Sequence, residues 1–145
     1  MKTTKLLLAG FLVFGSVVMK GQNVASTSTL TSGGSTAGSS GTGGAYYGYE
    51  AGKVTTGANN SFFGHQAGKA NTTGTHNLFL GHQAGVSNSS GSQNICIGSY
   101  SGGSTGTSGS SIYIGYMSGQ SNSGGDNVIL EPNRDLIQVV VEILT

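Results

Sequence analysis

The chain has 145 residues, of which 27 are glycine and one is proline, and only 8% are charged, with a net charge of +1. Its lysines and arginines are scattered and form no basic patch, which argues against nucleic-acid binding. A composition so poor in charge and rich in glycine is also compatible with disorder, but disorder does not explain the regular repeat described below.

The N-terminal segment, residues 1–21, has the features of a secretory signal peptide. Two lysines lie within its first five residues, and an uncharged apolar run extends from Leu6 to Met19. This run is shorter than the ~20 residues that cross a bilayer as a helix, which disfavours an uncleaved membrane anchor. We expect cleavage near Gly21, no transmembrane segment in the mature chain, and a secreted or cell-surface location.

Residues 22–44 consist mostly of Ser, Thr, Gly and Ala and show no periodicity. Such a composition is typical of flexible linkers. We therefore expect a linker or stalk that holds the following residues away from their point of attachment.

Residues 45–130 form a repeat. Two series of glycines recur in one frame, each at an interval of 16 and then at three intervals of 17 residues. Copies this short cannot bury an apolar face alone, and they normally stack on their neighbours to make one continuous core. The first series is Gly48, Gly64, Gly81, Gly98 and Gly115, and the second is Gly52, Gly68, Gly85, Gly102 and Gly119.

A mostly apolar triplet precedes the first-series glycines. Branched and aromatic residues in so short a run predict a strand, and glycines at two or three places in each period would cost a helix ~1 kcal/mol apiece. We predict an all-β protein, a parallel β-solenoid (β-roll) of about five 17-residue coils, advancing ~4.8 Å per coil. The triplets are Ser61-Phe62-Phe63, Leu78-Phe79-Leu80, Ile95-Cys96-Ile97, Ile112-Tyr113-Ile114 and, closing the series, Val128-Ile129-Leu130.

Two further columns of the repeat are interpreted as structural. The residue before the triplet is Asn or Ser, and an Asn there can hydrogen-bond its own backbone and stack on the Asn of the next coil. A small residue precedes the second-series glycine, which indicates an inward position with little room. The columns are Asn60, Asn77, Asn94, Ser111 and Asn127, and Ala51, Ala67, Ala84, Ser101 and Ser118.

Each triplet is apolar on both faces, because side chains alternate along a strand. If the flanking residues fill the interior, the middle column forms an exposed apolar stripe, and such a stripe usually marks an interface. We infer self-association on this basis; the alternative is a coil wide enough to hold both columns. The middle column is Tyr46, Phe62, Phe79, Cys96, Tyr113 and Ile129.

Cys96 is the single cysteine of the chain, so an intrachain disulfide is excluded. Its place inside an apolar triplet favours a small buried hydrophobic residue. The alternatives are an intermolecular disulfide or a reactive thiol.

The repeats offer little catalytic chemistry. Their only carboxylates, Glu50 and Asp126, stand at opposite ends, whereas glycosidic hydrolysis needs a close pair. No nucleophile elbow or phosphate-binding lysine is present, and the copies lack the aspartates of calcium-binding repeats. We therefore expect no enzymatic activity, no cofactor and no metal, and an enzyme acting on polysaccharide is the least supported hypothesis.

His65 and His82 share one repeat position, which Tyr49, Ser99 and Tyr116 occupy in the other copies. Two imidazoles do not make a zinc site without further ligands. The column predicts a solvent-facing row of hydrogen-bonding and partly aromatic side chains. Such a row could contact carbohydrate, a matrix protein or a host surface, or it could be a solvated ladder without a ligand, and we assign no binding residue.

Residues 131–145 differ from the repeats. Pro132 interrupts the pattern, and the run from Leu136 to Leu144 is rich in β-branched and aliphatic residues, which is typical of a strand. It is interpreted as a closing strand that covers the last open coil or as the start of a larger region.

The units from Phe62 to Gly68 and from Leu78 to Gly85, with Asn ahead and Thr-Thr-Gly or Ser-Ser-Gly behind, resemble the β-roll head repeats of trimeric autotransporter adhesins. They are also similar to repeats of other bacterial surface and fibre proteins. The resemblance covers about residues 45–130. It implies a left-handed parallel β-roll, a homotrimer of chains packed side by side, display outside a bacterial cell and a role in attachment.

The function expected from these observations is that of a non-enzymatic, secreted or cell-surface structural or adhesion protein. The alternative is an ice-binding solenoid, since threonines at strand spacing on a flat face can match a water lattice. Thr55, Thr56, Thr72, Thr73 and Thr105 align in part, but Ser89, Ser90 and Ser123 interrupt the row.

Overall fold

The computed structural model describes residues 24–26, 30–38, 40–103, 106 and 108–130. The predicted signal peptide and the predicted closing strand at 131–145 lie outside these residues. Within the described part of the chain the protein is all-β, and no helix there is long and apolar enough to cross a membrane.

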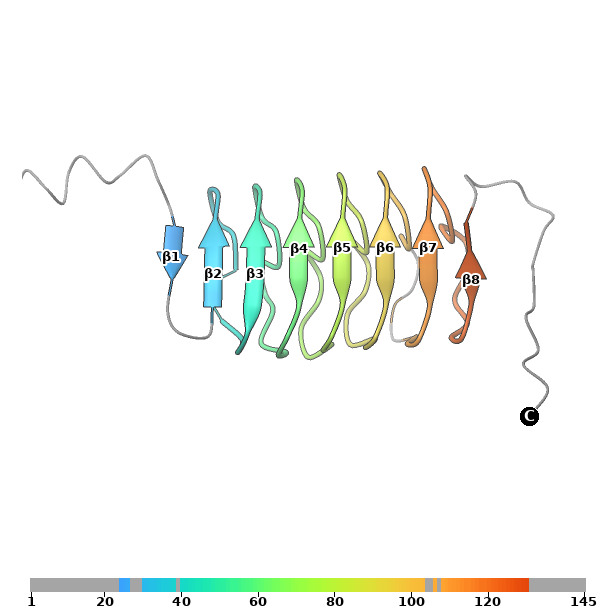
Figure 1. The fold of residues 1–145 in the computed structure, drawn as a ribbon, viewed down its shortest axis with the longest axis horizontal. Helices are drawn as coiled ribbons and strands as arrows, with labels where there is room; N and C mark the ends of the chain where they lie inside the picture. Colours follow the sequence, from blue (N-terminus) through green and yellow to red (C-terminus); the bar gives the residue numbers. More distant parts are fainter. Residues whose placement is uncertain (1–23, 27–29, 39, 104–105, 107, 131–145) are drawn as a thin grey trace, which may run out of the picture.

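Eight strands lie side by side in chain order in one sheet (Figure 1). The first pairs antiparallel with the second, and all later neighbours pair parallel. The seven parallel strands form a β-solenoid of about six turns, so the predicted solenoid is confirmed. The strands are β1 (Val24–Ser26), β2 (Leu30–Gly33), β3 (Gly44–Tyr47), β4 (Ser61–Phe63), β5 (Leu78–Leu80), β6 (Ile95–Ile97), β7 (Ile112–Ile114) and β8 (Val128–Ile129).

The solenoid begins one coil before the predicted boundary at residue 45. In the segment expected to be a linker, β2 pairs in register with β3, with Ser32 opposite Tyr46. The sequence did not predict this coil, because its buried middle residue is Ser32 instead of an aromatic residue. Its glycines have a structural role: a Cβ on Gly38 would overlap the carbonyl of Gly52 and touch the Tyr46 ring.

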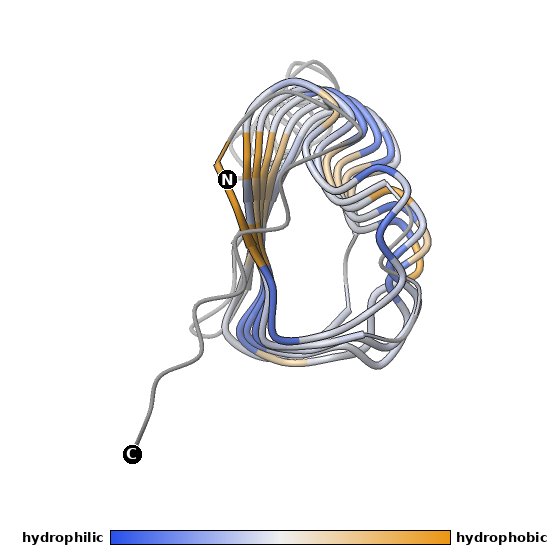
Figure 2. Ribbon diagram, turned by 90° about the vertical axis from the view of Figure 1, so that its right-hand side faces the viewer, coloured by the Kyte–Doolittle hydropathy of each residue, from blue (hydrophilic) through white to orange (hydrophobic). Residues whose placement is uncertain are grey.

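The middle column faces the interior, so the prediction that it forms an exposed stripe is wrong. Figure 2 looks along the coils, with the apolar strands on one side and the connecting loops closing the other. The second-series glycine and the small residue before it leave space for one large side chain per coil, and the two flanking side chains therefore point outward. The side chains that fill this space, all fully buried, are Tyr46, Phe62, Phe79, Cys96 and Tyr113.

Gly64 and Gly68 illustrate why both glycine series recur. Gly64 has a φ of +139°, and a Cβ on it would overlap the carbonyl of Gly81 in the next coil. Gly68 has a φ of +58°, and a Cβ on it would overlap the Phe62 ring. The first series thus allows adjacent coils to approach closely, and the second leaves room for the buried ring.

The predicted asparagine ladder is confirmed. The backbone N–H of Asn77 donates to Oδ1 of Asn60 at 3.0 Å, and that of Asn94 donates to Oδ1 of Asn77 at 2.9 Å. Ser111 continues the ladder, because its Oγ accepts the N–H of Asn127. The predicted inward position of the small residues is also confirmed, since Ala51, Ala67, Ala84, Ser101 and Ser118 are fully buried.

A second asparagine ladder was not anticipated. Asn88 Nδ2 donates to Asn71 Oδ1 at 2.9 Å, and both side chains are fully buried in the loops opposite the strands. Each also donates to a carbonyl three residues ahead, in Gly91 and Gly74 respectively. Polar side chains therefore satisfy much of the buried loop backbone of the solenoid.

Candidate binding surfaces

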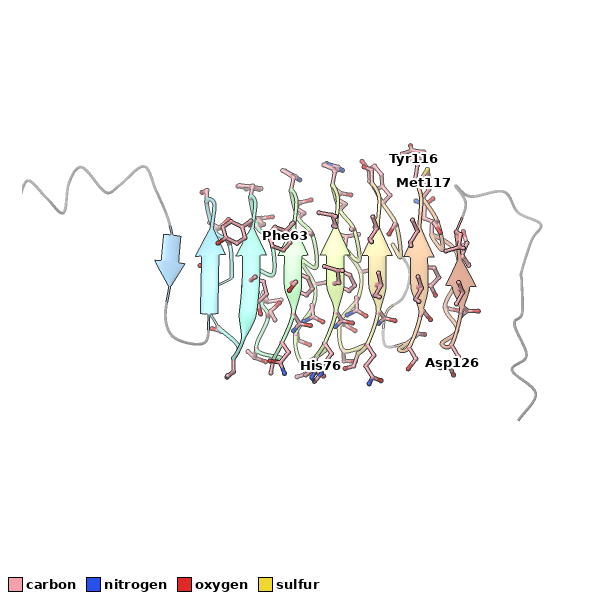
Figure 3. The ribbon with its side chains drawn as sticks, in the orientation of Figure 1. Phe63, His76, Tyr116, Met117 and Asp126 are labelled. Carbon is pink, nitrogen blue, oxygen red and sulfur yellow. The ribbon has the colours of Figure 1, made fainter. Side chains whose placement is uncertain are left out.

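The outer surface of the sheet is apolar. In β4 to β7 the residues on either side of the buried middle residue point outward, and none is charged; Leu80 is 46% exposed and Phe63 is 37% exposed. Figure 3 shows Phe63 on this side, where its ring stacks on Tyr47 with centroids 5.2 Å apart. We call this surface the outer apolar face: Ala45, Tyr47, Ser61, Phe63, Leu78, Leu80, Ile95, Ile97, Ile112, Ile114 and Val128.

A row of aromatic and imidazole rings runs along the corner where the strands end. Tyr49, His65 and His82 stack with centroids 5.2 and 5.0 Å apart, and Tyr116 at the far end is 58% exposed. In Figure 3, Tyr116 lies beyond the end of β7, away from the middle of the sheet. The predicted solvent-facing column therefore exists. Ser99 is the member of that column without a ring. We call the set of rings at this corner the corner row: Tyr49, His65, His82, Tyr100 and Tyr116.

Tyr100 is the member of the corner row that the repeat spacing did not predict. It occupies the repeat position of Gln66 and Gln83, one residue after the expected column, but its ring contacts the rings of that column in the adjacent coils. Its centroid lies 5.1 Å from that of His82 and 6.4 Å from that of Tyr116, with ring planes at 68° and 90°. The clue in the sequence was a tyrosine immediately after the one serine of the column.

The backbone of this corner is fixed from coil to coil. Gln66, Gln83 and Tyr100 have left-handed φ values of 56° to 60°. Their N–H groups donate to the carbonyls of Tyr49, His65 and His82 at 2.7 to 2.9 Å. These bonds hold the backbone under the corner row in register from coil to coil, which fixes where each ring is attached.

Glu50 is the centre of a charge cluster beside the corner row. Its carboxylate accepts Lys53 Nζ at 2.6 Å, Lys69 Nζ at 2.8 Å and Gln66 Nε2 at 3.0 Å. These hydrogen bonds lower the pKa of Glu50 to about 2, and the bond from Lys53 has the largest effect, ahead of those from Lys69 and Gln66. A carboxylate so firmly ionised is poorly suited to act as a general acid near neutral pH.

The other carboxylate of the repeats lies far along the solenoid. Asp126 is exposed just before β8, whereas Glu50 follows β3, and Figure 3 shows Asp126 at the opposite corner from Tyr116. The structure does not bring the two acids together. Among the described residues, no group of three His, Cys, Asp or Glu side chains is arranged to hold a metal ion.

A second, polar corner lies before the strands. Its five residues all have left-handed φ values of 58° to 62°, and all are exposed. Asn59 Nδ2 lies 3.1 Å from His76 Nε2, and Figure 3 shows His76 at this corner. We call it the polar corner: Asn59, His76, Gln93, Ser110 and Asp126.

Cys96 is fully buried between Phe79 and Tyr113 in the sheet register, as predicted for a small hydrophobic residue. Burial raises the pKa of its thiol to about 12. The thiol is therefore protonated and is no nucleophile in the folded chain.

The threonines do not form an outward ladder of free hydroxyls. Thr55 is buried and donates to the carbonyl of Asn71. The exposed Thr56 and Thr72 donate to the carbonyls of Thr72 and Ser89 in the following coils, at 3.1 and 2.8 Å. Thr105 lies outside the described residues.

No family model matches this chain, and the comparisons found no curated protein and no solved structure that is significantly similar to it. The resemblance to adhesin head repeats therefore remains a prediction from the motifs. The outer apolar face and the two corners are the candidate binding surfaces of the described residues.

Proposed function

We propose that this chain is a non-enzymatic structural or adhesion protein, exported to the cell surface or the extracellular space, whose solenoid assembles with copies of itself through the outer apolar face. Following the resemblance to adhesin head repeats, the assembly is a homotrimer. The observation that supports this most is the outer apolar face, whose side chains are exposed or half-buried although the other side of the sheet is already packed.

The chemistry of the outer apolar face fits an interface between copies. Parallel sheets are normally covered on both sides, and contiguous apolar patches on monomers usually mark sites of association. The face carries no charge that would have to be buried. The corner row and the polar corner flank it with hydrogen-bonding groups, which gives the apolar centre and polar rim of an ordinary interface.

The rival functions receive less support. Glycosidic hydrolysis needs two neighbouring carboxylates, whereas Glu50 is held by two lysines and Asp126 lies at the other end. Ice binding needs an outward array of hydroxyls, whereas Thr56 and Thr72 donate theirs to neighbouring coils.

The mass of residues 22–145 in solution tests the proposal. Sedimentation equilibrium at several concentrations should give a trimer for the wild-type chain and a monomer for the double variant Leu80→Lys, Ile114→Lys. Val54→Lys is the matched control, since Val54 is 47% exposed but lies outside the outer apolar face. A wild-type monomer, or a double variant that assembles as the wild type does, would refute assembly through this face.

A further inference from the structure

The rings of the corner row are not required by the fold. The solenoid accepts a serine at the same backbone position, both at Ser99 and at Ser35, which stands opposite Tyr49 in the preceding coil. The rings of Tyr49 and Tyr116 are 47% and 58% exposed and lie outside the buried core. Rings at an exposed corner, where serine is sufficient for the fold, are amphipathic side chains that a ligand can reach.

The chemistry that the corner row offers is neutral and hydrogen-bonding. Stacked rings cover one another's faces, so the tyrosine and histidine rings present their edges, with phenol hydroxyls and imidazole nitrogens. Beside them runs an amide ladder, in which Gln83 Nε2 donates to Gln66 Oε1 at 2.9 Å. At Tyr100 the ring planes turn by 68° and 90°, which ends the face-to-face stacking there.

The shape of the row restricts the ligand. It is one side chain wide and repeats every 5.0 to 5.2 Å over its first three rings. A folded protein partner normally covers about 800 Å² on each side, which a single row does not offer. A linear polymer lying along the solenoid axis, in contrast, can place successive units against successive coils.

The charge near the row restricts the ligand further. Single-stranded nucleic acids and anionic glycans require a positively charged groove. Lys53 and Lys69, which lie beside the row, share the one carboxylate of Glu50. The cluster of two lysines and one carboxylate therefore keeps a net charge of only +1, which does not make a positively charged groove. The hydroxyls of a neutral sugar can instead both donate to and accept from tyrosine, histidine and glutamine.

We propose that the corner row binds a neutral linear polysaccharide that lies along the solenoid axis. This names a ligand class for the attachment role proposed above, and it rests on that proposal. The row would recognise the sugar through hydrogen bonds from ring edges and amides, with the axis of the solenoid setting the direction of the chain.

The three histidines of the protein provide an internal control. His65 and His82 belong to the corner row, whereas His76 lies in the polar corner. We would titrate the full mature chain with cellohexaose, xylohexaose and mannohexaose, and record the imidazole resonances by NMR. The proposal expects at least one of these sugars to shift the His65 and His82 signals while the His76 signal stays in place.

Two further probes represent the other possible partners: a heparin oligosaccharide and a collagen-like triple-helical peptide. The proposal is overturned if no neutral sugar shifts the His65 and His82 resonances, or if the resonances of all three histidines shift equally. It is also overturned if only heparin or the collagen-like peptide shifts the His65 and His82 resonances. The mass of the same sample is measured in parallel. If the protein is a trimer but no sugar shifts the His65 and His82 resonances, polysaccharide binding is refuted while the proposed assembly is still supported.

Substitutions give a second readout by affinity electrophoresis in the sugar that binds best. His65→Ser with His82→Ser reproduces the natural Ser99 and should weaken binding by about tenfold or more. His76→Ser is the matched control, because Ser110 occupies the equivalent position, and it should bind as the wild type does. If the double variant proves unstable, Tyr116→Ser at the exposed end of the row replaces it. Unchanged binding by the row variant would refute the site.

Discussion

Phe62 and Phe79 stack inside the solenoid with ring centroids 4.8 Å apart and ring planes 7° apart, and both side chains are fully buried. Each ring fills the interior of its own coil and covers the ring of its neighbour. The core is therefore a column, and a defect in one coil affects the coils on either side.

Replacing Phe79 with alanine should lower the free energy of unfolding by about 3–5 kcal/mol, because it removes a buried ring and leaves a cavity. Urea unfolding followed by circular dichroism measures this loss. Val54→Ala is the control at an exposed apolar position and should cost about 0.5 kcal/mol or less. Equal losses in the two variants would contradict the inward position of the middle column.

Gly81→Ala should destabilise the solenoid by about 1–3 kcal/mol, because Gly81 has a φ of +140° and a Cβ there would overlap the Gly98 carbonyl. Gly124→Ala is the control, since a Cβ there meets no atom closer than 3.5 Å. Thermal unfolding of both variants checks the prediction. A Gly81→Ala variant as stable as the control would show that adjacent coils can separate at little cost.

Asn77→Ala should cost about 1–3 kcal/mol, because it leaves the buried N–H of Asn94 without its partner and removes one of the two side-chain donors to the Gly91 carbonyl. Asn77→Ser should cost less, since Ser111 continues the same ladder with a hydroxyl. The two denaturation midpoints are compared directly. An alanine variant no worse than the serine variant would argue against a stabilising ladder.

Acid should weaken the fold through Glu50. Its folded pKa of about 2 lies below the ordinary value of 4.5, so the ionised carboxylate stabilises the fold above pH 4.5. That contribution is lost as the pH falls from 4.5 to about 2. Urea midpoints measured across this range should fall more steeply for the wild type than for Glu50→Gln, and parallel curves would contradict the ion-pair cluster.

The Cys96 thiol should react with iodoacetamide only after unfolding, because it is buried and burial raises its pKa to about 12. Mass spectrometry after labelling at pH 8, with and without urea, measures this. The urea-unfolded chain is the control, and equally fast labelling of the native chain would place the thiol at the surface.

The repeating pattern was sufficient to predict the solenoid, its strands and the asparagine ladder. Each of these depends on neighbours at a fixed interval, so a residue such as Asn77 and its partner Asn60 are related by the period alone. The same holds for the imidazole stack of His65 and His82. The coil around β2 escaped prediction because its interval to β3 is 14 residues and its core residue is Ser32.

The sequence by itself determined that short apolar strands stack in parallel at a fixed period, because only that arrangement places its glycines, asparagines and triplets in register. Which side of each strand faces inward was decided by the tertiary structure. Alternation cannot choose between two apolar sides, whereas the closed coil has room for one large side chain opposite Ala67 and Gly68. The tertiary structure also decided that Tyr100 belongs to the corner row, since its ring contacts are with His82 and Tyr116 in the adjacent coils.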